Sequence, residues 1–105
     1  MKEYKITLNG KEETWYLSEK EMTHADAMAF IEKAGKRAPE LAELLQKDVS
    51  GKTRLRLLHG AGANGCAWCR SSLFDDYNLA FNVNLFGGNV YTDVRNAYYF
   101  AICRD

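Results

Sequence analysis

The last forty residues of the chain, 66–105, contain three short runs in which apolar and polar residues alternate. The runs cover 66–72, 78–85 and 98–104, and turn-forming Asn, Gly and Asp residues separate them. Alternation with a period of two is typical of strands that bury one face. The C-terminal part of the chain therefore predicts three strands of an antiparallel sheet.

The N-terminal part predicts a hairpin. Residues 4–8 alternate between polar and apolar and end at Asn9-Gly10, which is the strongest short hairpin signal. Residues 13–17 supply the returning strand.

Two helices are predicted after the hairpin. Thr23 can cap the first helix, whose apolar residues recur with helical spacing until Gly35 ends it. Pro39 fits the first turn of a second, shorter helix that ends near Lys47 or Asp48.

The region between the second helix and the C-terminal strands is less regular. Residues 53–58 alternate Arg with Leu and favour a strand, and residues 59–65 are a glycine-rich loop. The segregation of helices from strands indicates an α+β domain, and no linker divides residues 1–105.

Composition limits the classes of function. Fourteen basic residues balance fourteen acidic ones, which disfavours general nucleic-acid or anionic-membrane binding. The N-terminus lacks an apolar signal segment, and no stretch is long enough to span a bilayer. Three cysteines are too few for a disulfide framework. The sequence therefore predicts a soluble, cytoplasmic protein.

Residues 22–45 and 66–105 resemble the C-type-lectin-like domain of bacterial and phage proteins of the Fibrobacter major-paralogous-domain type. The resemblance covers about two-thirds of the chain and rests on five motifs in the family's order. These are Met22-Thr23-His24-Ala25-Asp26-Ala27, Arg37-Ala38-Pro39-Glu40-Leu41, Trp68 with Ser71-Ser72, Ala80 to Leu85 with Gly87-Gly88, and Tyr98 to Arg104.

The resemblance implies a minimal version of this fold, with two helices packed on an antiparallel sheet and adjacent N- and C-terminal strands. The chain departs from the family pattern at Phe81, where Trp is usual, at Ala38, where Leu is usual, and at Cys69, where Ser is expected. The fold hosts sugar binding, protein binding and, in larger relatives, enzymes, so it implies no single activity.

Cys66 and Cys69 form a CxxC motif. A redox motif needs its first cysteine at a helix N-terminus, and a zinc site needs four ligands. Here the motif enters a predicted strand, and His24, His59 and Cys103 are distant in sequence. We therefore expect the two cysteines to flank a buried Trp68, with no metal and no cofactor.

Other chemical motifs are incomplete. The glycines of the 59–65 loop have the spacing Gly-x-Gly-x-x-Gly, but no helix is predicted after them, as a dinucleotide site would require. Asn82 and Asn84 alternate with apolar residues and are expected to face away from the core, without the carboxylates of a calcium-dependent sugar site. No catalytic set is evident, so we expect a protein that is not an enzyme.

The function predicted is that of a binding module whose loops contact a protein partner. A small chain of this kind suits a phage or mobile-element inhibitor of a host defence complex, of the anti-CRISPR kind. The alternatives are a carbohydrate- or glycoconjugate-binding domain from an exported protein and, less favoured, a thiol-redox protein using Cys66 and Cys69. The candidate contact residues are Arg70, Asp75, Asp76, Tyr77, Tyr91 and Arg95.

Overall fold

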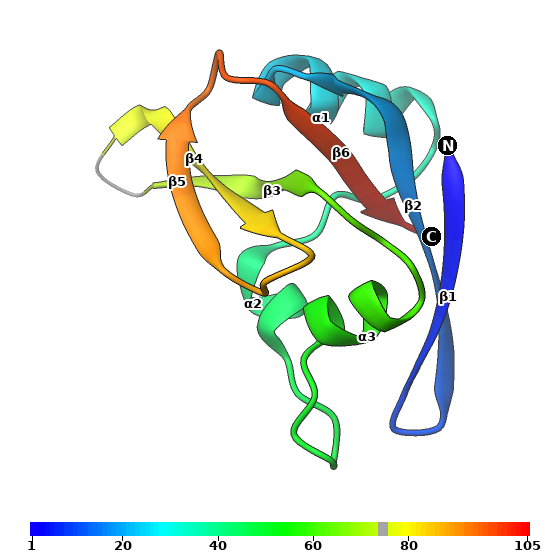
Figure 1. Ribbon diagram of the computed structural model, residues 1–105. Coiled ribbons are helices and arrows are strands. Elements are labelled where there is room, and N and C mark those ends of the chain that lie inside the picture. The colour runs from blue at the N-terminus through cyan, green and yellow to red at the C-terminus, as the bar shows by residue number, and fades with distance from the viewer. Residues whose placement is uncertain (74–75) are drawn as a thin grey trace.

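The computed structural model describes the backbone of residues 1–73 and 76–105 and the side chains of residues 1–71 and 78–105. This part of the chain forms a small, compact α+β domain with six strands and three helices (Figure 1). The elements are β1 (Lys2–Leu8), β2 (Lys11–Met22), α1 (His24–Lys33), α2 (Leu41–Leu45), α3 (Arg54–Gly60), β3 (Cys66–Leu73), β4 (Asp76–Asn84), β5 (Val90–Val94) and β6 (Tyr99–Arg104).

The strands form one sheet in the order β1-β2-β6-β3-β4-β5. The opening hairpin and the final strand share this sheet, as predicted, because β2 pairs with β6. Two expectations were wrong. The sheet is mixed rather than antiparallel, since β3 and β6 run parallel, and β2 separates β1 from β6, so the first and last strands are not neighbours. The C-terminal region also contains one strand more than predicted, β5, which pairs with β4.

Helices cover both faces of the sheet. Ala27 and Ile31 of α1 pack with Trp68 on one face, whereas helices α2 and α3 pack with Ala67 and Cys69 on the other. Because side chains alternate along a strand, Trp68 lies in the core on the α1 face of the sheet, and its neighbours Ala67 and Cys69 lie in the core on the α2–α3 face. Trp68 is fully buried, as expected.

Asn82 shows the consequence of this double cover. It was expected to face away from the core, but it is 1% exposed, because it lies opposite Trp68 on the face that α1 covers. Period-two alternation indicates a solvent-facing side only when one face of the sheet is bare.

The hairpin and the first helix follow their local signals. Asn9 and Gly10 both have positive φ, 50° and 82°, as a tight two-residue turn requires. The Thr23 side chain accepts a hydrogen bond from the Asp26 backbone N–H, and Gly35, with φ of 68°, follows the end of α1.

The middle of the chain differs from the prediction. A strand was expected over residues 53–58, but Arg54–Gly60 forms helix α3 with Thr53 as its N-cap. The Thr53 hydroxyl accepts from the Arg56 N–H, and Leu55 and Leu58, three residues apart, are buried together. Pro39 lies before α2 rather than in its first turn, and its carbonyl accepts from the Arg70 N–H at 2.9 Å. No helix in the described residues is both long and apolar enough to cross a membrane.

Candidate functional site

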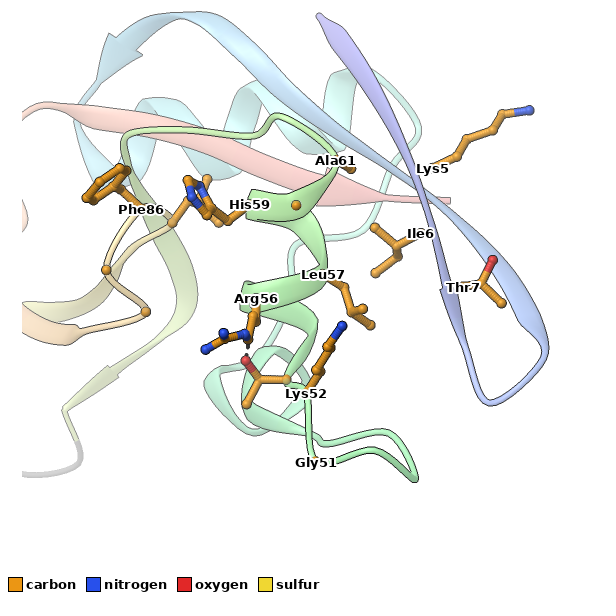
Figure 2. Close-up of a pocket in the computed structure, with 15 residues that line it drawn as sticks. Lys5, Ile6, Thr7, Gly51, Lys52, Arg56, Leu57, His59, Ala61 and Phe86 are labelled. Carbon is orange, nitrogen blue, oxygen red and sulfur yellow. Dashed lines mark hydrogen bonds between the residues drawn. The ribbon is translucent and has the colours of Figure 1, made fainter.

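A groove of about 820 Å³ crosses the exposed side of α3 (Figure 2). Strand β1 bounds it on one side and the turn between β4 and β5 on the other. The helix divides its lining into two halves. The lining residues are Lys5, Ile6, Thr7, Gly51, Lys52, Thr53, Arg56, Leu57, His59, Gly60, Ala61, Leu85, Phe86, Gly87 and Gly88.

The polar character of the groove is basic. Lys52 and Arg56 are exposed, and Arg56 and His59 are three residues apart, so they lie on the same side of α3. In Figure 2 the Arg56 side chain extends to the side of Phe86, whereas Lys52 extends to the side of β1, and Lys5 points away from the helix. None of the groove residues that the structure describes is acidic. The groove is therefore suited to a ligand that carries negative charge.

Phe86 provides an exposed aromatic surface at one end. The Asn84 side-chain oxygen accepts from the Phe86 N–H at 3.0 Å, and the Asn84 carbonyl accepts from the Gly88 N–H at 2.7 Å. These bonds hold a tight turn that leaves Phe86 69% exposed. The His59 and Phe86 rings are in contact and nearly perpendicular, with centroids 5.1 Å apart. The buried Nδ1 of His59 has no hydrogen-bond partner among the described residues.

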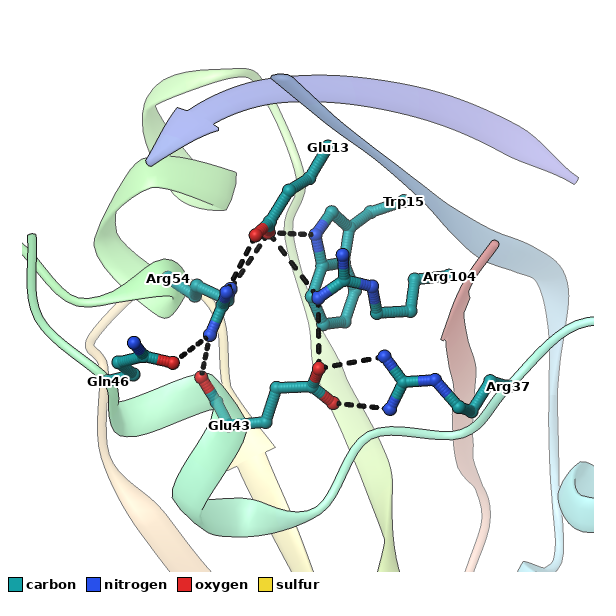
Figure 3. Close-up of polar contacts among 7 residues, drawn as sticks. All are labelled: Glu13, Trp15, Arg37, Glu43, Gln46, Arg54 and Arg104. Atoms are coloured by element: carbon teal, nitrogen blue, oxygen red, sulfur yellow. Dashed lines mark hydrogen bonds and ion pairs between the residues drawn. The ribbon is translucent and has the colours of Figure 1, made fainter. Parts of the chain in front are cut away.

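A buried ion network fixes the floor under α3 (Figure 3). Arg54, the first residue of α3, makes a bidentate pair with Glu13 of β2 through Nε–Oε1 at 2.8 Å and Nη2–Oε2 at 2.6 Å. The Trp15 indole N–H donates to Glu13 at 3.1 Å. Arg54 Nη1 also donates to the Glu43 carbonyl and the Gln46 side chain. The network therefore ties α2 and α3 to the sheet and sets the orientation of the groove-lining side of α3.

The second carboxylate of the network joins two further guanidinium groups. Glu43 accepts two hydrogen bonds from Arg37, at 3.1 and 2.9 Å, and one from Arg104 at 2.9 Å. The Arg54 hydrogen bond holds the pKa of Glu13 below its usual value, against the effect of burial. Burial acts to raise the pKa of Glu43, but the pairing with Arg37 and Arg104 outweighs it and the pKa is lowered. Both carboxylates are thus charged at neutral pH.

Of the residues predicted as partner contacts, Arg70, Tyr91 and Arg95 do not line this groove. The exposed Arg70 side chain is on β3, 3.9 Å from Glu40, and Tyr91 is on β5, 47% exposed. The Arg95 carbonyl accepts from the His24 N–H at 3.0 Å, at the start of α1. Asp75 and the side chains of Asp76 and Tyr77 lie outside the described residues.

The cysteine thiols are in positions that disfavour reactivity. The described residues contain three free cysteines, and Cys69 and Cys103 are buried. Burial raises the pKa of Cys69 to about 12 and that of Cys103 to about 11. Cys66 and Cys69 do not share a face of β3, because Ala67 and Cys69 both face the α2–α3 side. No group of three metal-ligating side chains occurs among the described residues.

The groove was not predicted from the sequence. Its lining comes from segments around residues 5–7, 51–61 and 85–88, which are far apart in the chain. One local signal was present: in Asn84-Leu85-Phe86-Gly87-Gly88 the Asn and the paired glycines indicate a tight turn that presents Phe86 to solvent.

Comparisons of the chain with protein families, with curated proteins and with solved structures give no match.

Proposed function

We propose that the protein is a non-enzymatic binding module that holds an acidic segment of a partner protein in the groove over α3. The observation that carries this proposal is the coincidence of Lys52, Arg56 and the exposed Phe86 around one hollow with no acidic residue in its described lining. A chain with no net charge has no general attraction for anions, so the basic groove is a local feature.

The chemistry of the groove suits a peptide with alternating acidic and apolar side chains. Carboxylates of the partner would pair with Arg56, whose planar guanidinium offers bidentate geometry, and with Lys52. An apolar side chain would pack against the exposed surface of Phe86, whose ring is already in contact with the His59 ring. Exposed aromatic and Arg residues of this kind are enriched at the energetic centres of protein interfaces.

We also propose that the scaffold is a variant of the C-type-lectin-like fold. The pairing of the opening hairpin with the closing strand supports this, as does the burial of Trp68 between α1 and the sheet. Helix α3 and the parallel β3–β6 pair are its departures from the expected pattern. In its most specific form, the proposal is that the partner is a bacterial defence complex inhibited by a phage-encoded protein.

The absence of catalysis is part of the proposal. With a pKa of about 12, the Cys69 thiol is protonated at neutral pH, and only a thiolate is an effective nucleophile or redox group. A Cys66→Ser/Cys69→Ser double variant should therefore retain partner binding. Loss of binding in this variant, with the fold intact, would favour a thiol-dependent function.

The groove is tested by charge reversal with a matched control. Wild type, Lys52→Glu/Arg56→Glu and Lys2→Glu/Lys20→Glu are immobilised and exposed to the same bacterial lysate, and retained proteins are identified by mass spectrometry. The control pair is exposed and lies outside the groove, and it changes the net charge equally. The expected result is a protein retained by wild type and control, lost from the groove variant, and eluted by a Glu- and Leu-rich peptide. Equal retention by all three proteins, or retention of glycans alone, would refute the groove assignment.

A further inference from the structure

Strand β5 is an exposed edge of the sheet. It pairs with β4 on one side, and its five residues Val-Tyr-Thr-Asp-Val include three apolar or aromatic side chains with large exposed fractions. Val90 is 37% exposed, Tyr91 47% and Val94 46%. In Figure 1 this strand lies at the opposite side of the sheet from β1.

The hydrogen-bond pattern identifies which backbone groups of β5 face outward. The Arg95 N–H donates to the Asn78 carbonyl, and the Asn84 N–H donates to the Asn89 carbonyl, both at 2.8 Å. In an antiparallel pair the residues alternate between bonding to the neighbouring strand and pointing away from it. Positions 89, 91, 93 and 95 therefore bond to β4, and the peptide groups of positions 90, 92 and 94 point outward.

One of the outward groups has a local partner. The Val94 N–H donates to the carboxylate of Asp93 at 2.8 Å. The other oxygen of this carboxylate accepts from the Tyr99 hydroxyl, which keeps Asp93 turned to its own domain. The outward N–H groups open to a new strand are therefore those of Val90 and Thr92. The Asp93 carboxylate does not extend past this edge, so it does not block strand pairing.

The other edge of the sheet is protected. The closing pair of the β1–β2 hairpin is Leu8 with Lys11, so alternation makes residues 3, 5 and 7 of β1 the outward ones. Two of these are charged, Glu3 and Lys5. Charged side chains on an edge strand are a usual device against strand pairing, and the outward residues of β5 carry none.

We propose that β5 pairs with β5 of a second copy of this chain, antiparallel and with the twofold axis at Thr92. In this register the two Thr92 residues face each other, and Val90 faces Val94 of the second copy. Each Thr92 N–H then donates to the Thr92 carbonyl of the other strand, and each Val90 N–H donates to the Val94 carbonyl of the other strand. Tyr91 lies opposite Asp93 of the second copy, on the face of the sheet that α1 covers.

The sequence of β5 favours a second copy over a foreign strand. The outward residues read Val-Thr-Val, which is the same in both directions, so the antiparallel pair places Val against Val at both ends. β-Branched pairs of this kind stabilise facing strands. The chain has no net charge, so two copies do not repel each other at long range. The interface is small, and the dimer is therefore expected at concentrations of hundreds of micromolar rather than nanomolar.

Sedimentation equilibrium tests the proposal over a range of concentrations. Wild type is expected to rise from a mass of 11.9 kDa towards twice that value. Thr92→Pro removes an outward N–H that has no hydrogen-bond partner among the described residues. It should raise the dissociation constant by about tenfold, since two hydrogen bonds are lost per dimer. Thr7→Pro, the matched change on β1, should leave it unchanged. Far-ultraviolet circular dichroism checks that each variant is folded, and Thr92→Lys serves the same purpose as Thr92→Pro if proline disturbs the strand.

Cross-linking tests the register. In a Cys66→Ser background, Thr92→Cys should form an intermolecular disulfide on mild oxidation, because facing hydrogen-bonded residues have Cα atoms about 5.5 Å apart. Thr7→Cys should not. The proposal is overturned if wild type stays monomeric at 1 mM, or if the position 92 variants dimerise as wild type does. It is also overturned if the β5 variants lose a captured foreign protein while wild type remains monomeric, since β5 would then receive a strand from that protein.

Discussion

The ion pair between Glu13 and Arg54 lies almost out of contact with water, since each side chain is 8% exposed. Replacing Glu13 by Gln would keep the size of the side chain and remove its charge. Arg54 would then lose its carboxylate partner, since it meets Glu43 only at the backbone carbonyl. The one carboxylate left in the network, that of Glu43, pairs with Arg37 and Arg104. Breaking one side of a buried pair costs about 3–5 kcal/mol, because the remaining charge is left uncompensated.

Urea denaturation followed by tryptophan fluorescence measures this loss. With an m-value of about 1–3 kcal/mol/M for a domain of this size, Glu13→Gln should lower the midpoint by at least about 1 M. The neighbouring residue gives a matched control: Glu12 pairs with Lys5 at 3.8 Å, and these side chains are 65% and 58% exposed. Glu12→Gln should cost less than about 1 kcal/mol.

A double-variant cycle separates the pair from its surroundings. Arg54→Met alone leaves Glu13 without its main partner, whereas Glu13→Gln/Arg54→Met removes both charges, so the double variant should lose at least about 2 kcal/mol less than the sum of the single losses. Additive losses, agreeing within about 0.5 kcal/mol, would refute the view that the pair acts as a unit. An equal effect of Glu12→Gln and Glu13→Gln would refute the role of burial.

Three other predictions concern stability. Trp68→Ala should cost about 3–5 kcal/mol through lost burial and a cavity, and a melting temperature within a degree or two of wild type would contradict it. Burial lowers the pKa of His24, so its contribution to stability is present above the unfolded pKa of about 6.5 and is lost as pH falls through the lower folded value. His24→Gln should therefore flatten the pH dependence of the urea midpoint between pH 7 and 5. If the curves of wild type and His24→Gln are parallel, His24 is not the source of the pH dependence. Gly65→Ala should destabilise by more than about 1 kcal/mol, because φ is 98° and the new Cβ would lie 2.7 Å from the Phe100 ring; Gly62→Ala, with φ of 102° but no atom closer than 4.0 Å, should lose less in the same thermal melt.

Features that depend on neighbouring residues were predictable from the sequence. The Asn9-Gly10 turn, the Thr23 cap and the alternation near the C-terminus each act within a few residues, and each produced the expected element. The prediction of a strand over residues 53–58 was wrong because the local pattern fits two structures. Their Arg-Leu alternation also satisfies a helix with Leu55 and Leu58 inward, and the choice is settled by a partner for Arg54 that lies forty-one positions away.

The candidate site was less predictable than the fold. Its cationic helix, its aromatic turn and its β1 wall have no common motif, and they meet only after the sheet has formed. Similarly, the exposed or buried state of Asn82 depends on α1 covering the second face of the sheet. A local sequence pattern does not predict which distant segment will cover a residue.

The position of β6 has a consequence for how the chain is made. This strand comes last in the sequence, yet it lies in the interior of the sheet with β2 on one side and β3 on the other. During synthesis the hairpin β1–β2 and the strands β3, β4 and β5 are therefore complete before residues 99–104 leave the ribosome, but they cannot form one sheet until then. Pairing β6 with β2 requires contacts between residues far apart in the sequence, and such contacts form slowly. Until that step, the edges of β2 and β3 that pair with β6 in the folded domain are unpaired, and unpaired strand edges favour aggregation.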